Sequence, residues 1–512
     1  MRLARLIQAV DDRINPIVVK ELRQAVQSRF VVTGLGLFLV LQLFVLGFQL
    51  LGQHYTSDSG SANYFAGRET FHLLQMLLLG TVLIFVPLYT GIRLAAERSD
   101  VNVDLMFISA LRPRSIVAGK LFAALMLTLL MFSACAPFMT FSYLLRGIDI
   151  PSILLVLFLD LLAVLGCTQA AIVLASIPAN RLVKGLLGLV GLFLLGSCLY
   201  ATINITSAMI QGFGMGLLLR GEALVVLAAW IALALLGTGL LFTCSVAMIS
   251  PPSANRALPV RLMLFAVWLG SLAVALISDH VTKSVWGVSL WAWANTFLFC
   301  GQIVIAINER DRWAPRVART IPRPRLLRIL AFLFYSGAGG GVVFAVLILI
   351  VTWFIDFQVE FSSGISVNRY GRQSPGLLVL YTLCYSLTAV FIGRVLLGAR
   401  FKAQYTWVLA AVLVGLGGSL PMIAFLLVPE TYDRGPQRTY LWMAGNPVVA
   451  VTDPENSVFY LGVTFIWSVL AVLACSGWFF DQVRAFRPPK KAKPQTPVKE
   501  PVLEVLPAGE ST

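Results

Sequence analysis

The sequence predicts an all-α protein: a polytopic membrane helix bundle of about twelve transmembrane helices, preceded by an interfacial amphipathic helix. Hydrophobic residues make up 58% of the 512 residues and charged residues only 12%, whereas a soluble domain carries roughly 25% charged residues. Apolar runs long enough to cross about 30 Å of hydrocarbon recur along the chain. Lysine and arginine gather in alternate loops between these runs, as expected for a membrane protein.

The apolar runs fall into two groups of six. The first group defines a membrane domain within residues 31–250 and consists of Val31–Gly52, Phe71–Leu94, Leu121–Leu145, Ile153–Ile177, Leu186–Ile210 and Ala223–Ile249. The second defines a membrane domain within residues 262–480 and consists of Leu262–Ser278, Trp286–Ile307, Ile329–Ile355, Pro375–Leu397, Thr406–Val428 and Phe459–Phe480.

The distribution of charge orients these spans. If the N-terminus is cytoplasmic, 31 of the 39 lysines and arginines lie in cytoplasmic segments and eight lie in outside loops. This bias favours an even number of spans. We expect no cleavable signal peptide, because the first apolar run begins at Val31, after thirty residues rich in charge. The sequence therefore predicts a multi-pass protein of a bacterial inner (cytoplasmic) membrane with both termini in the cytoplasm.

The two ends of the chain differ in kind. Residues 1–30 predict a cytoplasmic amphipathic helix, which Asn15 can cap and for which Pro16 suits the first position. Its apolar face holds Ile17, Val18, Leu22, Ala25 and Val26, and its polar face holds Lys20, Arg23, Gln24 and Gln27. Because a span follows directly, we expect this helix to lie on the lipid interface. Residues 487–512 are rich in Pro, Lys and Glu and predict a disordered cytoplasmic tail.

Several classes of function are disfavoured. The formal charge of +15 arises in short loops, so we interpret it as a signal for topology and contact with the lipid bilayer, with no nucleic acid as partner. The seven cysteines lie in apolar runs, and the three histidines lack carboxylates at metal-ligand spacing, so no metal site is predicted. We find no catalytic constellation and no G-x-x-x-x-G-K-S/T motif for ATP.

The segment 97–120, which follows the second span, carries the clearest functional signal. Asp104 suits the first turn of a short helix, where the helix dipole favours an anion. Leu105, Met106 and Phe107 then give this cytoplasmic helix an apolar surface. An apolar helix that projects into the cytosol needs a partner to cover it, so a cytosolic protein partner is predicted. A cytoplasmic loop without a partner is the plain alternative.

The same segment resembles the loop between the second and third helices of ATP-binding-cassette (ABC) permeases of the second exporter type. The pattern of that family runs E-R-E-x-G-T-x-D-x-L-L-x-x-P-L-S-x-x-x-I-V-x-G-K. It is matched at Glu97, Arg98, Asp104, Leu105, Met106, Leu111, Ile116, Val117, Gly119 and Lys120. The chain departs from it at Val101-Asn102, where the family has Gly-Thr, and at Ala110, where Pro is common. The segment from Asn15 to Arg23 resembles the interfacial connecting helix of the family.

This resemblance covers about the first half of the chain and implies a six-helix permease-like domain at 31–250. In the family the loop forms a coupling helix that docks on a separate ABC ATPase subunit, and that subunit uses the ATP. The implied partner-binding residues are Glu97, Asp104, Leu105, Met106, Phe107, Leu111 and Lys120. We therefore predict a permease subunit of an ATP-driven exporter that binds no cofactor directly and is not an enzyme.

The second membrane domain, residues 262–480, matches the family poorly. Glu309-Arg310 and Arg323-Pro324-Arg325 repeat Glu97-Arg98 and Arg112-Pro113-Arg114 at nearly the same separation. A degenerate duplication explains this repeat, and so do basic flanks with a helix-starting proline. If the domain is accessory, the first half should pair as a homodimer. We favour the homodimer, because the later loop lacks the apolar coupling segment.

Polar residues inside the spans are candidates for a transport pathway. Asp160 could bind a proton or cation, although we favour a paired or hydrated carboxylate a turn or two from the outer interface. Thr202, Asn204 and Thr206 form a predicted polar patch, with interhelical hydrogen bonding as the alternative. Gly337 to Gly341 interrupts the predicted ninth span, either as a broken-helix binding site or as a place of close helix packing.

Two other functions remain open. An ion-coupled secondary transporter would need essential carboxylates in the membrane, and only Asp160 qualifies clearly. A non-transporting membrane scaffold derived from a permease would show no substrate-stimulated ATPase activity in any complex.

Overall fold

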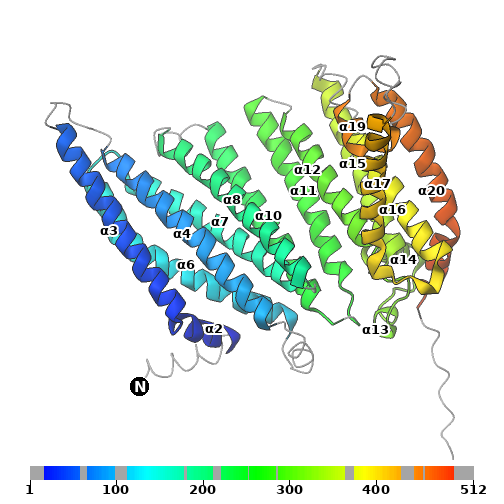
Figure 1. The fold of residues 1–512 in the computed structure, drawn as a ribbon, viewed down its shortest axis with the longest axis horizontal. Helices are drawn as coiled ribbons and strands as arrows, with labels where there is room; N and C mark the ends of the chain where they lie inside the picture. Colours follow the sequence, from blue (N-terminus) through cyan, green and yellow to red (C-terminus); the bar gives the residue numbers. More distant parts are fainter. Residues whose placement is uncertain are drawn as a thin grey trace, which may run out of the picture.

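Figure 1 shows the fold of the chain in a computed structural model. The structure describes residues 16–57, 66–97, 112–177, 181–211, 221–251, 253–283, 286–363, 374–427, 443–453 and 456–488. Every regular element in these ranges is a helix, which confirms the predicted all-α class. The predicted tail lies outside the described residues, except for Arg487 and Pro488.

Among the described residues, twelve helices are long and apolar enough to cross a membrane. In chain order they are α3 (Arg29–Ser57), α4 (Ala66–Glu97), α6 (Pro113–Leu144), α7 (Ile150–Ser176), α8 (Arg181–Gln211), α10 (Gly221–Ile249), α11 (Ala257–Thr282), α12 (Trp286–Ala306), α15 (Ala338–Ser363), α16 (Ser374–Val390) with the π-helical turn that continues it, α17 (Thr406–Leu427) and α20 (Ser457–Ala485). The chain is therefore a multi-pass membrane protein.

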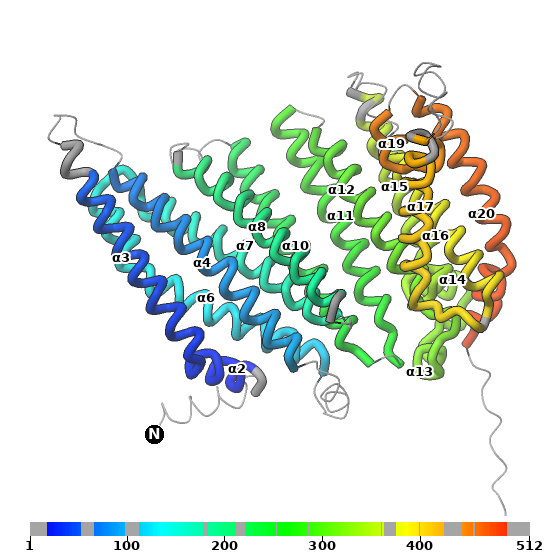
Figure 2. Tube along the Cα trace, in the orientation of Figure 1, coloured from blue at the N-terminus to red at the C-terminus, as the bar shows by residue number. Residues whose placement is uncertain are grey.

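The long helices form two bundles that follow one another along the molecule (Figures 1 and 2). In the first bundle, buried apolar side chains of α3, α4, α6, α7 and α8 pack around Phe71, Leu78 and Met131. In the second, side chains of α11, α12, α15, α16, α17 and α20 pack around Phe299 and Leu349. Helix α10 packs along both α7 and α11 and so connects the two bundles.

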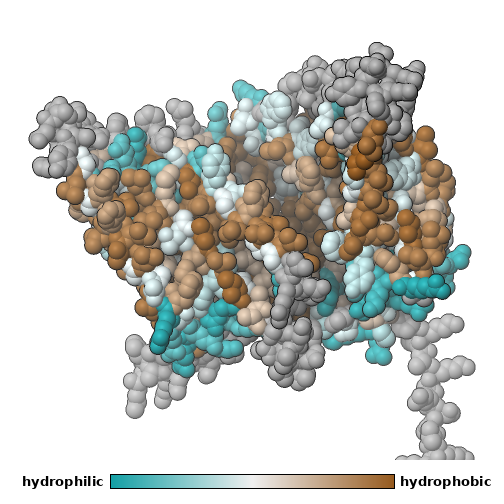
Figure 3. All heavy atoms as spheres, in the orientation of Figure 1, coloured by the Kyte–Doolittle hydropathy of each residue, from teal (hydrophilic) through white to brown (hydrophobic). Residues whose placement is uncertain are grey.

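The outer surface fits a lipid environment. Figure 3 shows a broad hydrophobic belt across the helices, with hydrophilic residues gathered along the lower edge of the molecule. Large apolar side chains such as Phe44, Phe193 and Leu290 are exposed on α3, α8 and α12. Exposure of these apolar side chains to lipid carries no hydrophobic penalty, and each helix satisfies its own backbone hydrogen bonds.

Three short helices, α2 (Pro16–Val26), α13 (Pro315–Ala318) and α14 (Arg325–Phe334), lie towards one end of the bundles, the lower end in Figure 1. Helix α2 precedes α3, and α13 and α14 lie between α12 and α15. We call this end the basic end, because segment 308–328 carries seven arginines. The remaining short elements are the π-helical turn η1 (Phe391–Leu396), the 3-10 helices η2 (Gly398–Arg400), η3 (Ala403–Tyr405) and η6 (Met443–Gly445), and α19 (Pro447–Thr452).

The predicted ninth span, Ile329–Ile355, is wrong in its first part. Residues before Tyr335 form the separate helix α14, and the spanning helix α15 begins only at Ala338. The glycine run therefore stands at the start of a span and does not interrupt one. Hydropathy alone could not separate the two helices, because α14 is itself rich in leucine and isoleucine.

Close packing explains two of these glycines. A Cβ added at Gly340 would lie 2.1 Å from the backbone oxygen of Phe332. A Cβ added at Gly341 would lie 2.3 Å from Arg261 Nη2 and 2.7 Å from Ala306 Cβ. No side chain fits at either distance, so glycine lets α15 approach α14, α11 and α12.

Candidate functional site

The predicted coupling segment is described only at its two ends. Asp104, Leu105, Met106, Phe107 and Leu111 lie outside the described residues. Glu97 is the last residue of α4, and Lys120 lies about two turns into α6. The structure brings these two residues into contact.

A buried ion cluster joins the two ends of the segment. Lys120 Nζ lies 2.7 Å from Glu97 Oε2 and 2.7 Å from Glu21 Oε1. The side chains of Lys120 and Glu21 are 4% and 10% exposed, whereas that of Glu97 is 35% exposed. One ammonium group therefore links α2, α4 and α6. We call Glu21, Glu97 and Lys120 the lysine cluster.

The sequence of α2 explains why Glu21 reaches Lys120. Val18, Glu21 and Ala25 recur at helical spacing, are buried, and lie on the helix that packs against α6. Lys20 is exposed, as predicted for the polar face. Glu21 was not among the predicted site residues, although a carboxylate on an apolar helix face is a usable signal, because a buried charge needs a partner.

Val26, on the apolar face predicted for α2, is 60% exposed in the protein, as a residue that faces the lipid interface would be. Its neighbour Ala25 is buried. The buried face of α2 is thus narrower than the pattern of apolar residues indicates, because only one stripe of the short helix meets α6.

A second polar contact fastens α2 to α4. Arg93 of α4 donates hydrogen bonds to Gln24 Oε1 of α2 and, at 2.6 Å, to the hydroxyl of Tyr89 one turn earlier. Its guanidinium also lies 5.5 Å from the centroid of the Tyr89 ring. Arg93 and Lys120 line the same narrow crevice together with Glu21. Helix α2 is thus held at both Glu21 and Gln24.

Asp160 is buried between helices of the first bundle. Gln75 Nε2 of α4 donates to its two carboxylate oxygens at 2.9 and 3.1 Å and lies 3.3 Å from Thr206 Oγ1 of α8. All three side chains have 0% exposure. Because Asp160 lies ten residues beyond Ile150, the first residue of α7, it is about 15 Å along that helix. The expected site a turn or two from the outer interface stays a prediction, since Asp160 lies seven residues, about two turns, beyond Ile153, the start of the predicted span.

Only two of the three residues of the predicted polar patch lie on the same buried face of α8. Thr202 and Thr206 lie one turn apart and are buried, and Thr202 donates to the backbone oxygen of Cys198 at 2.8 Å. Asn204 is exposed and donates to the backbone oxygen of Tyr200 at 2.7 Å. A separation of two residues turns a side chain by about 200° around a helix, which places Asn204 on the other side.

A second buried cation, Arg261 of α11, organises the basic end of the second bundle. Its guanidinium donates to Glu309 Oε1 at 2.6 Å. It also donates to the backbone oxygens of Leu333, Tyr335 and Gly337, at 2.9, 2.5 and 3.2 Å. These carbonyls belong to the break between α14 and α15, so Arg261 satisfies groups that the ends of those helices leave free. The side chain is 0% exposed.

A neighbouring ion pair continues this network. Arg394 of η1 pairs with Asp311 and donates to the backbone oxygen of Glu309 at 3.0 Å. Trp478 and Gln482 of α20 also donate to Asp311. Burial raises the pKa of the Glu309 carboxyl above its usual value, although the charges of the two arginines oppose this effect. The two carboxylates that follow α12 are thus bound by groups from α11, η1 and α20.

The repeated motifs at Glu97 and Glu309 have related but different surroundings. Glu97 ends the second helix of its bundle, Glu309 follows the second helix of its own, and each binds a buried cation. Lys120 comes from the helix after Glu97, whereas Arg261 comes from the helix before Glu309. The two bundles therefore bind these corresponding glutamates through cations from helices that do not correspond.

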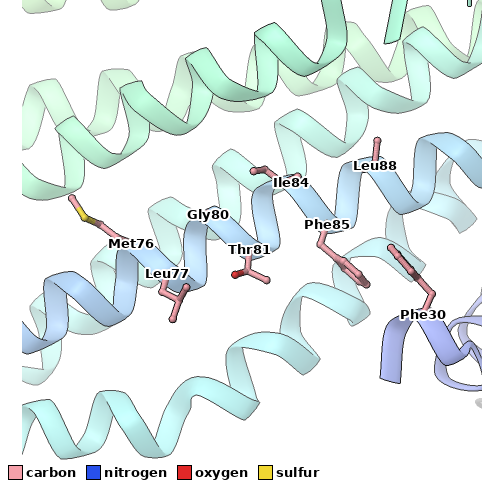
Figure 4. Close-up of a pocket in the computed structure, with 8 residues that line it drawn as sticks. All are labelled: Phe30, Met76, Leu77, Gly80, Thr81, Ile84, Phe85 and Leu88. Atoms are coloured by element: carbon pink, nitrogen blue, oxygen red, sulfur yellow. The ribbon is translucent and has the colours of Figure 1, made fainter. Parts of the chain in front are cut away.

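An apolar groove opens along α4 towards α3 (Figure 4). Phe30 lines one end, where its ring stacks on Phe85 with centroids 4.9 Å apart. The other lining residues are Met76, Leu77, Gly80, Thr81, Ile84 and Leu88. A groove without charged lining residues suits a lipid chain better than a polar solute.

Within the ranges that the structure describes, no group of three His, Cys, Asp or Glu side chains could hold a metal ion. Comparisons with protein-family models, with curated proteins and with solved structures found no match for this chain.

Proposed function

We propose that this chain is the membrane-spanning permease subunit of an ABC-type exporter, energised by a separate ATPase that docks on segment 97–120. The observation that carries the proposal is the lysine cluster. Lys120 binds both Glu97, at the start of the segment, and Glu21 of α2. A docking segment must transmit the movement of the ATPase to the membrane helices. Segment 97–120 can do so, because the buried ammonium group of Lys120, at its end, binds Glu97, at its start.

The path of that force follows from the packing. A displacement of the docked segment would move α4 and α6 together, because Glu97 and Lys120 join their ends. Helix α4 also packs against α7 and carries Gln75, which binds Asp160. Closure of the ATPase could therefore shift the first bundle between two arrangements, as alternating access requires.

The basic end would face the cytoplasm of a bacterial cell, because lysine and arginine concentrate on the cytoplasmic side of inner-membrane proteins. The second bundle would be accessory, and two copies of the chain would supply the two membrane halves. A degenerate second half in each chain is the alternative, in which case one chain would suffice.

The experiment is purification of the affinity-tagged full chain from its native membranes, followed by identification of bound proteins by mass spectrometry. We expect an ATPase with a G-x-x-x-x-G-K-S/T motif at a fixed ratio to the chain, and ATP hydrolysis by the complex. Purified chain that retains no such ATPase, after mild solubilisation and crosslinking in the membrane, would contradict the proposal.

One observation favours a second candidate, an ion-coupled secondary transporter. Asp160 is fully buried, and its carboxylate oxygens are bound by the single amide of Gln75. Carboxylates at such depth often carry protons or cations. The two candidates differ in energy source: uptake or efflux that survives ATP depletion but stops on collapse of the ion gradient would favour this second function.

A further inference from the structure

A basic surface of the second bundle has no part in the proposed docking of the ATPase. It consists of six exposed arginines from the segment that follows α12 up to the first residue of α14: Arg310, Arg312, Arg316, Arg319, Arg323 and Arg325. Within the part of the chain that the structure describes, none of the six forms an ion pair. We call these six residues the arginine platform.

The charge of the platform is uncompensated because its neighbouring acids are already bound. Glu309 and Asp311 are the two carboxylates nearest in sequence, and they pair with Arg261 and Arg394 from other helices. The network inside the bundle therefore leaves the six outer guanidinium groups to attract an external anion.

The platform is held in a fixed shape. Ile321, Ala331 and Phe486 form a small buried cluster beneath it. The Trp313 ring lies 5.0 Å from that of Phe486, and the Tyr335 hydroxyl donates to the backbone oxygen of Thr320 at 3.0 Å. These contacts tie α13 and α14 to the end of α20, so the arginines are presented by packed elements.

Helix α14 places the platform at the membrane surface. Four large apolar side chains of this ten-residue helix are exposed: Leu326, Leu327, Ile329 and Leu330. The chain then enters the spanning helix α15 after only three residues, Tyr335 to Gly337. An apolar helix so close to a span lies in the boundary between lipid chains and headgroups, with adjoining arginines at headgroup depth. Hydrophilic residues do gather along this edge in Figure 3.

We propose that the arginine platform binds the phosphate groups of anionic phospholipids in the leaflet at the basic end. Guanidinium groups donate paired hydrogen bonds to phosphate oxygens, and the apolar side chains of α14 would contact the acyl chains of the same lipids. The exposed leucines favour a lipid surface over an acidic soluble protein, which would leave them facing the bilayer without a role.

This site would also stabilise the second bundle. The backbone between α14 and α15 is bound by Arg261, which in turn holds Glu309 after α12. Lipid that fixes α14 therefore restrains a junction shared by α11, α12 and α15. We expect anionic lipid to raise the unfolding temperature, because a ligand that binds only the folded state stabilises it.

The experiment measures lipid binding to the purified full chain by native mass spectrometry. The probes are phosphatidylglycerol and phosphatidylcholine with identical acyl chains, supplied at equal concentration. We expect the wild-type chain to retain phosphatidylglycerol preferentially. In the variant R316Q/R319Q/R323Q/R325Q, we expect that preference to fall roughly tenfold, together with the thermal stabilisation.

A matched control removes four exposed cations from the basic end of the first bundle, in the variant K20Q/R23Q/R29Q/R114Q. We expect this control to keep most of the preference. If the quadruple platform variant does not fold, R319Q/R323Q should show a loss of roughly threefold. Equal preference in the platform variants and the wild type would overturn the proposal, as would equal loss in the control. A wild-type chain that retains both lipids equally would overturn it too, because the platform would then show no preference for an anionic headgroup.

Discussion

Lys120 Nζ and Glu21 Oε1 lie 2.7 Å apart, although 99 residues separate them in the chain. Glu97 approaches the same ammonium from the end of α4. A surface helix, the end of one span and the start of another are thus joined at a single buried charge.

Lys120→Met should destabilise the first bundle strongly. The substitution removes the cation and leaves Glu21, whose side chain is 10% exposed, without its partner. Breaking a buried pair in this way costs about 3–5 kcal/mol. Glu97→Gln should cost less than about 1 kcal/mol, because that side chain is partly exposed to solvent. Thermal unfolding of the purified variants measures both effects, and equal unfolding temperatures for the two variants would contradict the assigned roles.

Gly341→Ala should destabilise the second bundle. The new methyl group would lie 2.3 Å from Arg261 Nη2 and 2.7 Å from Ala306 Cβ. Forcing a group into such a packed site costs about 1–3 kcal/mol or more. The matched control is Gly301→Ala on α12, where a Cβ would meet nothing within 4 Å. We expect a lower unfolding temperature for the first variant only; a stable Gly341→Ala chain would mean that Arg261 is not packed against this position.

Gln75→Leu should lower stability by leaving Asp160 without its hydrogen-bond donor. An unsatisfied buried polar group costs about 1–3 kcal/mol. The double variant Q75L/D160L should recover part of the loss, since it removes both polar groups. Asn204→Leu is the control, because Asn204 is exposed and its side chain bonds only to its own helix. Additive effects of the two single substitutions in a thermal double-mutant cycle would argue against the contact.

The sequence was sufficient for features that depend on local pattern. Each predicted span overlaps a long apolar helix, because the length of an apolar run decides whether it can cross a membrane. Residues 16–26 form a helix inside the segment predicted to be an amphipathic helix, whereas the predicted cap Asn15 lies outside the described residues. These features need no knowledge of how helices pack.

Features that depend on packing could not be predicted in the same way. Gln75 and Asp160 lie 85 residues apart in the chain, and their contact requires that α4 and α7 meet in one register. The start of the ninth span was misplaced, because the break at Tyr335 is stabilised by Arg261 of another helix. Helical spacing alone could have separated Asn204 from its threonine neighbours. The apolar residues of the coupling segment lie outside the described residues and stay a prediction.

Membrane topology is open to a direct test. Reporter fusions at Ser57, Arg372 and Pro436 should report the periplasm, and a fusion at Ala314 should report the cytoplasm. Ala314 lies immediately before α13 at the basic end, where arginine is concentrated and the cytoplasm is expected. A cytoplasmic signal at Pro436 would be incompatible with the orientation of the last spans.

The coupling segment itself provides the last prediction. If residues 103–111 dock on an ATPase, the apolar side chains of Leu105, Met106 and Phe107 anchor the interface. Truncation of one such anchor costs on the order of 1–3 kcal/mol at a well-packed interface. Ser109→Ala is the control within the same segment. Membrane abundance should be unchanged both by truncation of an anchor and by Ser109→Ala, because all these side chains lie outside the predicted spans.

Co-purification of the ATPase with the L105A/M106A/F107A variant tests whether the segment docks on the ATPase. We expect that the triple variant inserts normally into the membrane but retains less than about a tenth of the ATPase bound by the wild-type chain. The Ser109→Ala control should retain a normal amount. Undiminished recovery of the ATPase with the triple variant would contradict the docking role of the segment and, with it, the proposed energy source of the transporter.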